Sequence, residues 1–175
     1  MKKLFFLIIP VLFVFACKNT EQFRAPIDAL SADWEKTTTM VTEVGSMLTS
    51  AQSMVAGMKD SFMIDPKMKL TPAKTASLDS MKMAFNAQLD GLTGLANDFA
   101  AFTTAWAEKS AKVNALKEGL ASGKLEGDVM AQVEALKKDV AEANTNAEAW
   151  RSKTLAAQQT AINAYGMYKE NLMKK

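Results

Sequence analysis

The sequence has no histidine and only one cysteine among its 175 residues. Without histidine, the chain lacks the commonest general base and the commonest metal ligand. A single cysteine excludes an intramolecular disulfide and a zinc site built from cysteines. Serine and threonine are plentiful, but no nucleophile elbow or glycine-rich phosphate loop accompanies them. We therefore predict no enzyme activity, no metal site and no cofactor.

Glycine and proline are also scarce, at 8 and 4 residues, and aromatic residues make up 8% of the chain. No stretch alternates β-branched and polar residues, whereas alanine, lysine, glutamate, leucine and methionine are abundant. This composition is typical of an all-α protein.

Neither sign of charge dominates, since the net charge is +2 and Lys2 and Lys3 account for it. Without the first 16 residues, 19 basic side chains face 19 acidic ones. A nucleic-acid partner requires a basic face, so we expect none. The carboxylates lie on exposed helix positions, for example Glu134 four residues before Lys138, which predicts a surface ion pair.

A heptad pattern of apolar residues organises the middle of the chain. Steps of three and four residues connect Leu78, Met81, Phe85, Gln88, Leu92, Leu95, Phe99, Phe102, Trp106, Lys109, Val113, Leu116 and Leu120. Such a seam keeps one side of a long helix facing its partners. The pattern predicts a helix over 72–122, with Thr71 as its N-cap, Pro72 in its first turn and Gly123 as its C-cap. Two polar residues, Gln88 and Lys109, interrupt this seam, and Thr37 interrupts the apolar seam of the helix before it. We expect these polar residues to fix the register of the helices.

Two further seams predict the partner helices. One runs from Ile27 to Phe62 and predicts a helix over 27–64, which ends at Asp65-Pro66 because proline disfavours helical geometry in the residue before it. The other runs from Val129 to Tyr168 and predicts a helix over 128–173, with Asp128 as its N-cap. Together they predict an elongated antiparallel three-helix bundle over 27–175, similar in architecture to a spectrin repeat.

Aligning the helices through their short connections places large residues opposite small ones, for example Phe85 opposite Ala164. The same alignment leaves one end of the bundle with only two helices. Either residues 18–26 cover the aliphatic side chains there, or a partner or the membrane surface contacts them. The candidate contact patch consists of Val113, Leu116, Leu120, Val129 and Val133, next to Leu136.

The N-terminus has the pattern of a secretory signal. Met1-Lys2-Lys3 precedes 13 apolar residues (4–16), a length typical of a signal-peptide core and short for a membrane span. The core ends in Val14-Phe15-Ala16-Cys17, which resembles a bacterial lipobox, although Phe15 is bulkier than usual. The resemblance implies removal of residues 1–16 by cleavage between Ala16 and Cys17, and attachment of lipid to Cys17. Its alternative is an ordinary secretory signal that happens to end near a cysteine.

Residues 17–26 then form the lipidated cysteine and a tether to the bundle. By resemblance to the sorting rule of enterobacteria, Lys18 after the cysteine favours the outer membrane, with the protein facing the periplasm or the cell surface. A final lysine, Lys175, on a helical lipoprotein is similar to the murein lipoprotein, whose terminal lysine is joined to peptidoglycan. That family forms parallel trimers of single helices, whereas this chain is predicted to fold back twice. The alternative role for a terminal lysine is to complement the helix dipole.

The twelve methionines have two interpretations. They can fill irregular gaps in a helical core, or supply thioether ligands to Cu(I). We favour the first, since Met81 and Met83 are two residues apart and point in different directions on a helix.

Three functional hypotheses follow. The leading one is a non-catalytic, lipid-anchored helical rod that acts as a spacer, scaffold or protein-binding subunit at the bacterial outer membrane. The alternatives are a tether to peptidoglycan through Lys175, and a periplasmic carrier of a metal or a hydrophobic ligand. The membrane is the expected partner through Cys17, the protein partner is unidentified, and a helix-swapped dimer stays open.

Overall fold

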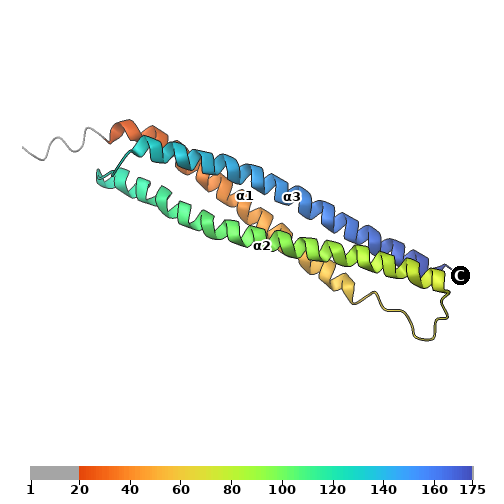
Figure 1. Ribbon diagram of the computed structural model, residues 1–175. Helices are drawn as coiled ribbons and strands as arrows, with labels where there is room; N and C mark the ends of the chain where they lie inside the picture. Colours follow the sequence, from red (N-terminus) through yellow and green to blue (C-terminus); the bar gives the residue numbers. More distant parts are fainter. Residues whose placement is uncertain (1–19, 175) are drawn as a thin grey trace, which may run out of the picture. The chain divides into compact units, whose positions relative to one another are not determined.

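The computed structural model describes residues 20–174, and 87% of these residues are helical. Three helices follow one another along the chain: α1 (Glu21–Lys59), α2 (Pro72–Ser122) and α3 (Val129–Met173) (Figure 1). They pack against one another as a three-helix bundle, and no strand occurs in this part of the chain. The predicted fold class is therefore confirmed.

The contacts divide the chain into two compact units, and every helix contributes to both. Unit 1 contains residues 20–36 and 107–140, and unit 2 contains residues 37–106 and 141–174. The division falls within helices rather than in the two connections, so each unit is itself an assembly of three helical segments.

The heptad seam of α2 lies on its buried side. No residue of the predicted seam from Leu78 to Leu120 is exposed, and Phe85 and Leu92 are fully buried. The seam of α1 is buried from Ile27 to Val55, and that of α3 is buried or half-buried throughout. The three-four spacing therefore identified the core of each helix correctly.

The ends of α2 and the start of α3 follow the predicted capping chemistry. Thr71 Oγ1 accepts a hydrogen bond from the Lys74 N–H at 3.3 Å, and Asp128 Oδ1 accepts one from the Ala131 N–H at 3.0 Å. Gly123 takes a φ of +70°, which glycine adopts without steric cost. The Lys124 N–H then donates to the Gly119 carbonyl at 2.8 Å, which completes a Schellman motif.

The bounds of α1 differ from the prediction at both ends. The helix begins at Glu21 rather than Ile27, so Pro26 lies inside it and most of the predicted tether is helical. Arg24 donates two hydrogen bonds to the Glu21 carboxylate, at 2.9 and 2.7 Å, and this pair stabilises the added first turn. Proline has no backbone N–H, so Pro26 removes one helical hydrogen bond near the start of α1.

At its other end, α1 stops at Lys59 rather than Ile64, and Phe62 lies in the connection. The Phe62 ring nevertheless enters the core, with its centroid 4.5 Å from those of Phe85 and Tyr168. Asp65-Pro66 does not end the helix. It forms a separate turn instead, in which the Met68 N–H donates to the Asp65 carbonyl at 2.9 Å.

Unit 2 has an antiparallel arrangement in which large side chains pack against small ones. Gln52 of α1 donates to the Leu92 carbonyl of α2, and Asn171 of α3 donates to the Ser77 hydroxyl of α2. Its buried cluster combines aliphatic side chains of α1, aromatic and aliphatic side chains of the α1–α2 connection and α2, and two alanines and a tyrosine of α3. The cluster contains Leu48, Ala51, Val55, Phe62, Leu78, Phe85, Leu92, Ala161, Ala164 and Tyr168.

Candidate functional sites

The residues predicted for processing and attachment lie outside the described part of the chain. These are Ala16 and Cys17 at the expected cleavage and lipidation point, and Lys175 as the expected peptidoglycan attachment point. Lipidation and attachment therefore stay predictions. The structure adds one fact to these predictions: α1 begins at Glu21, only four residues after Cys17.

The predicted contact patch in unit 1 is buried, which corrects the alternative of contact with a partner or the membrane and agrees with cover by the chain itself. Because α1 begins at Glu21, a third helical segment accompanies α2 and α3 throughout the unit. Trp34 of α1 donates its indole N–H to the Ser110 hydroxyl of α2 at 2.9 Å. The burial of all five side chains leaves no apolar patch there for a partner. The buried residues are Val113, Leu116, Leu120, Val129 and Val133.

Charged groups of unit 1 form ion pairs both between helices and within one helix. Lys109 Nζ of α2 lies 2.6 Å from Asp139 Oδ1 of α3, so the lysine that interrupts the predicted seam ends in an ion pair. Glu134 pairs with Lys137 of the same helix at 3.1 Å, three residues away, rather than with Lys138 as predicted. The first pair joins α2 to α3, and neither pair forms a group of acid and base poised for catalysis.

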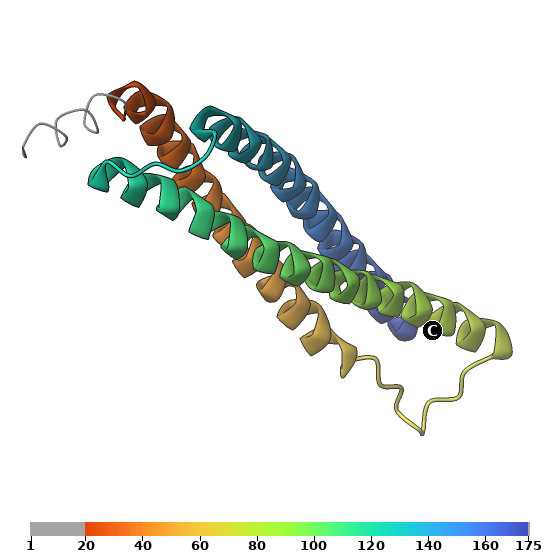
Figure 2. The same cartoon turned by 60° about the vertical axis from the view of Figure 1, so that its left-hand side comes forward.

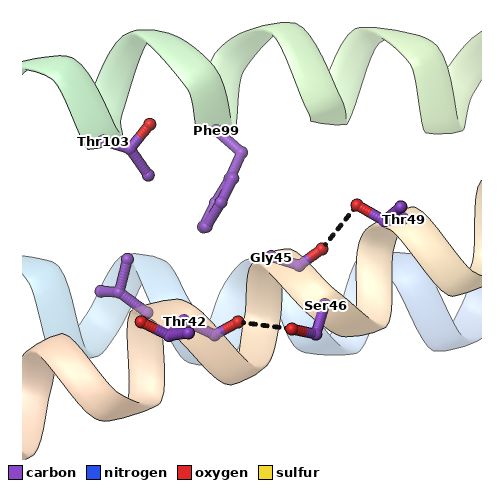
Figure 3. Close-up of a pocket in the computed structure, with 7 residues that line it drawn as sticks. Thr42, Gly45, Ser46, Thr49, Phe99 and Thr103 are labelled. Carbon is purple, nitrogen blue, oxygen red and sulfur yellow. Dashed lines mark hydrogen bonds between the residues drawn. The ribbon is translucent and has the colours of Figure 1, made fainter.

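A shallow hollow of about 550 Å³ lies between α1 and α2 in unit 2 (Figure 3). It exists because Gly45 lets the Phe99 ring approach α1, and a Cβ atom at Gly45 would lie 2.8 Å from Phe99 Cε1. Figure 3 shows the Phe99 ring pointing from α2 towards Gly45. The lining residues are Val41, Thr42, Gly45, Ser46, Thr49, Phe99 and Thr103.

The hydroxyl groups around this hollow are bonded to their own helices. Thr42, Ser46 and Thr49 each donate to the carbonyl four residues earlier, at 2.9, 3.1 and 3.0 Å. Thr103 donates to the Ala100 carbonyl at 2.9 Å. None of the four has a general base as its acceptor, so the hollow offers methyl groups and an aromatic edge for van der Waals contact.

Tyr168 is the one buried residue in the described chain with a clearly shifted pKa. Its ring is 1% exposed, and its hydroxyl has no hydrogen-bond partner among residues 20–174. Burial raises the pKa of the phenol, and the negative charge of Asp79 adds to the effect. A neutral phenol without a partner has a structural cost and no evident catalytic use.

Between residues 20 and 174, no three histidine, cysteine, aspartate or glutamate side chains gather as a metal site. The methionines fill gaps at the core only in part: Met58 and Met81 are half-buried and pack against the buried cluster, whereas seven other methionines are exposed. Met54 of α1 is 44% exposed, and Gln158 Nε2 lies 3.1 Å from its sulfur.

No helix among residues 20–174 combines the length and the apolar character that crossing a membrane requires. Comparison with known protein families, with curated proteins and with solved structures finds no match to this chain.

Sequence reasoning missed the polar contacts that join the helices within unit 2. Thr37 donates to Asn144 Oδ1 at 3.0 Å, and the Trp106 indole donates to the Thr38 hydroxyl at 3.0 Å. The break in the α1 seam at Thr37 signalled a polar contact, but its partner depends on the rotation of α3. The hollow at Gly45 was also missed, and the signal for it was a glycine directly beside the seam residue Val44.

Proposed function

We propose that this chain is a non-catalytic lipoprotein scaffold of the bacterial outer membrane, anchored through lipid on Cys17. The observation that carries the proposal is the lipobox-like Val14-Phe15-Ala16-Cys17 at the end of a 13-residue apolar core, in a chain with no other cysteine. Two or more acyl chains on one cysteine hold a protein stably on a bilayer, at about 0.8 kcal/mol for each buried CH₂.

The position of α1 supports a scaffold held close to its membrane. Four residues of chain span at most about 14 Å, so a lipid on Cys17 keeps Glu21 within that reach of the attachment point. The outer faces of the helices are then the surfaces that meet partner proteins. Leu155 on α3 is 50% exposed and is the one large exposed apolar residue of the described chain that is not a methionine.

The deciding experiment is mass analysis of the mature protein from membranes, with a Cys17→Ser variant as the matched control. We expect a mature chain that starts at Cys17, carries thioether diacylglycerol and an N-acyl group, and fractionates with the outer membrane. The Cys17→Ser chain should leave the membrane fraction. Unmodified Cys17 in a cleaved, water-extractable chain would overturn the proposal.

The same membranes test the tether to peptidoglycan. Detergent-boiled sacculi retain a protein that is covalently joined to the cell wall and release it with muramidase. We expect detergent alone to extract the whole protein, as a lipid anchor predicts. Retention that is lost when Lys175 is replaced by arginine would assign the tether role instead.

A further inference from the structure

Methionines account for most of the large hydrophobic side chains that are exposed among residues 20–174. Eight large hydrophobic side chains are exposed there, and seven of them are methionines. The core contains aliphatic, aromatic and alanine side chains and no methionine. A burial pattern that depended only on hydrophobicity would place some methionines inside, since methionine is among the residues most often buried.

Five of the seven come from three segments of unit 2. These segments are the α1–α2 connection, the first part of α2 and the last turns of α3, and the first part of α2 runs beside the last turns of α3 in both views (Figures 1 and 2). Lys74 Nζ near the start of α2 donates to the Leu172 carbonyl at 3.4 Å, which joins the start of α2 to the end of α3. We call this group the methionine surface, and it comprises Met63, Met68, Met83, Met167 and Met173.

The core beneath the methionine surface does not depend on these thioethers. The Phe62 ring packs against Phe85 and Tyr168 with centroid distances of 4.5 Å, and all three residues are buried. Two other methionines, Met58 and Met81, are half-buried and pack against this cluster. Unit 2 therefore has two classes of methionine, one exposed and one in contact with the core.

We propose that the methionine surface is a reversible oxidation site for hydrogen peroxide. The sulfur lone pair attacks one peroxide oxygen, so that an S–O bond forms as the O–O bond breaks. The departing hydroxide takes the proton of the transferred hydroxyl and becomes water. Each thioether loses two electrons and becomes a sulfoxide. Each hydrogen peroxide gains these two electrons, so that one of its oxygens ends on sulfur and the other leaves as water.

Exposure decides which sulfurs react and what the reaction does to the fold. Met63 is 76% exposed, Met173 72%, Met83 65% and Met167 57%, so peroxide reaches them without any opening of the helices. A sulfoxide is polar, which solvent tolerates at these positions, whereas the same group disrupts an apolar core. The chain can therefore accept several oxygen atoms and stay folded.

The test is a time course of the full chain, purified in detergent and treated with hydrogen peroxide, followed by peptide mass mapping. We expect sulfoxide at Met63, Met83, Met167 and Met173 to form at least roughly five-fold faster than at the half-buried methionines, because reactivity follows exposure. These four sulfoxides should leave the helical circular dichroism and the melting temperature unchanged. The two epimer-specific methionine sulfoxide reductases should then remove all four oxygens. The half-buried group is Met40, Met47, Met58 and Met81.

A matched pair of variants separates tolerance at the surface from damage to the core, with glutamine as a polar substitute for the sulfoxide. M63Q/M83Q should melt within about 2 °C of the parent chain, whereas M58Q/M81Q should melt lower by more than about 4 °C, since polar groups are placed against the Phe62 cluster. Equal oxidation rates in the two classes, unfolding on oxidation of the exposed class, or sulfoxides that the reductases leave in place would each overturn the proposal.

Discussion

Replacing Tyr168 by phenylalanine should stabilise the protein, although it deletes a polar group from a well-packed residue. The Tyr168 hydroxyl is buried and has no hydrogen-bond partner in the described chain, so the folded state bears its desolvation without compensation. An unsatisfied buried polar group costs about 1–3 kcal/mol. Phenylalanine keeps the ring contact with Phe62, whose centroid lies 4.5 Å away.

We expect Tyr168→Phe to raise the free energy of unfolding by about 1 kcal/mol, the lower end of that range. For a chain of this size, the melting temperature should rise by roughly 2–4 °C. Thermal and urea unfolding followed by circular dichroism measure both quantities. Tyr165→Phe is the matched control, because Tyr165 is only half-buried and its ring, which lies 5.3 Å from Lys169 Nζ, is retained.

The same variant has a second signature at alkaline pH. Burial and the Asp79 carboxylate raise the pKa of Tyr168 in the folded chain, whereas the unfolded chain releases this proton near pH 10. Above about pH 10 the folded state therefore binds more protons than the unfolded state, and stability falls as pH rises. Below that pH the contribution is fully present.

Tyr168→Phe should flatten this alkaline decline. Lysines titrate in the same pH range, so the measured quantity is the difference between the variant and parent curves of unfolding free energy against pH. A Tyr168→Phe chain that is less stable at pH 7 and keeps the parent's alkaline slope would refute the reasoning, since the hydroxyl would then have a stabilising partner.

Four further substitutions test the packing and the helix ends, with urea unfolding as the assay except where stated. Trp106→Ala should cost about 3–5 kcal/mol because a buried indole is lost, and a loss below about 1 kcal/mol would place this ring outside the core. Gly119→Ala should destabilise by about 1–3 kcal/mol, since its Cβ would lie 2.9 Å from the Lys124 carbonyl oxygen. Gly57→Ala, whose Cβ meets nothing within 4 Å, should stabilise by about 0.5–1 kcal/mol, and similar effects at both glycines would contradict the loop geometry. Lys74→Met removes the cation that bonds the Leu172 carbonyl at the end of α3, and it should accelerate amide hydrogen exchange in the last turn of α3. Unchanged exchange would mean that Lys74 does not hold this helix end.

The sequence predicted the parts of the fold in which each local signal agrees with the packing. The seam of α2 lies on the buried side of the helix. The predicted bounds of α2, 72–122, match the structure because Thr71 is a strong signal for the start of a helix and Gly123 for its end. Asp128 located the start of α3 within one residue for the same reason. Capping side chains act through their nearest backbone neighbours, so they can be recognised without knowledge of tertiary contacts.

The errors arose where tertiary contacts outweigh local signals. Phe62 continues the spacing of the α1 seam and is buried, yet it reaches the core from the connection after Lys59. Periodicity registers burial and does not distinguish a helical residue from a loop residue that folds back. At the other end, the apolar seam starts at Ile27 and gave no sign of the turn before it, in which Glu21 pairs with Arg24.

The candidate sites were harder to predict than the fold because they depend on side-chain exposure. The sequence left open whether the aliphatic residues of unit 1 are covered, and the structure buries them. It predicted methionines as gap fillers in the core, whereas seven of them are exposed and only Met58 and Met81 pack against the buried cluster. A third helical segment accompanies Leu116 and its neighbours, which are buried, whereas the Phe62 cluster of unit 2 is built from other side chains and Met63 and Met83 are exposed. Close packing thus determines which apolar side chains remain outside, and the thioethers that stay accessible have a reactivity that buried aliphatic groups lack.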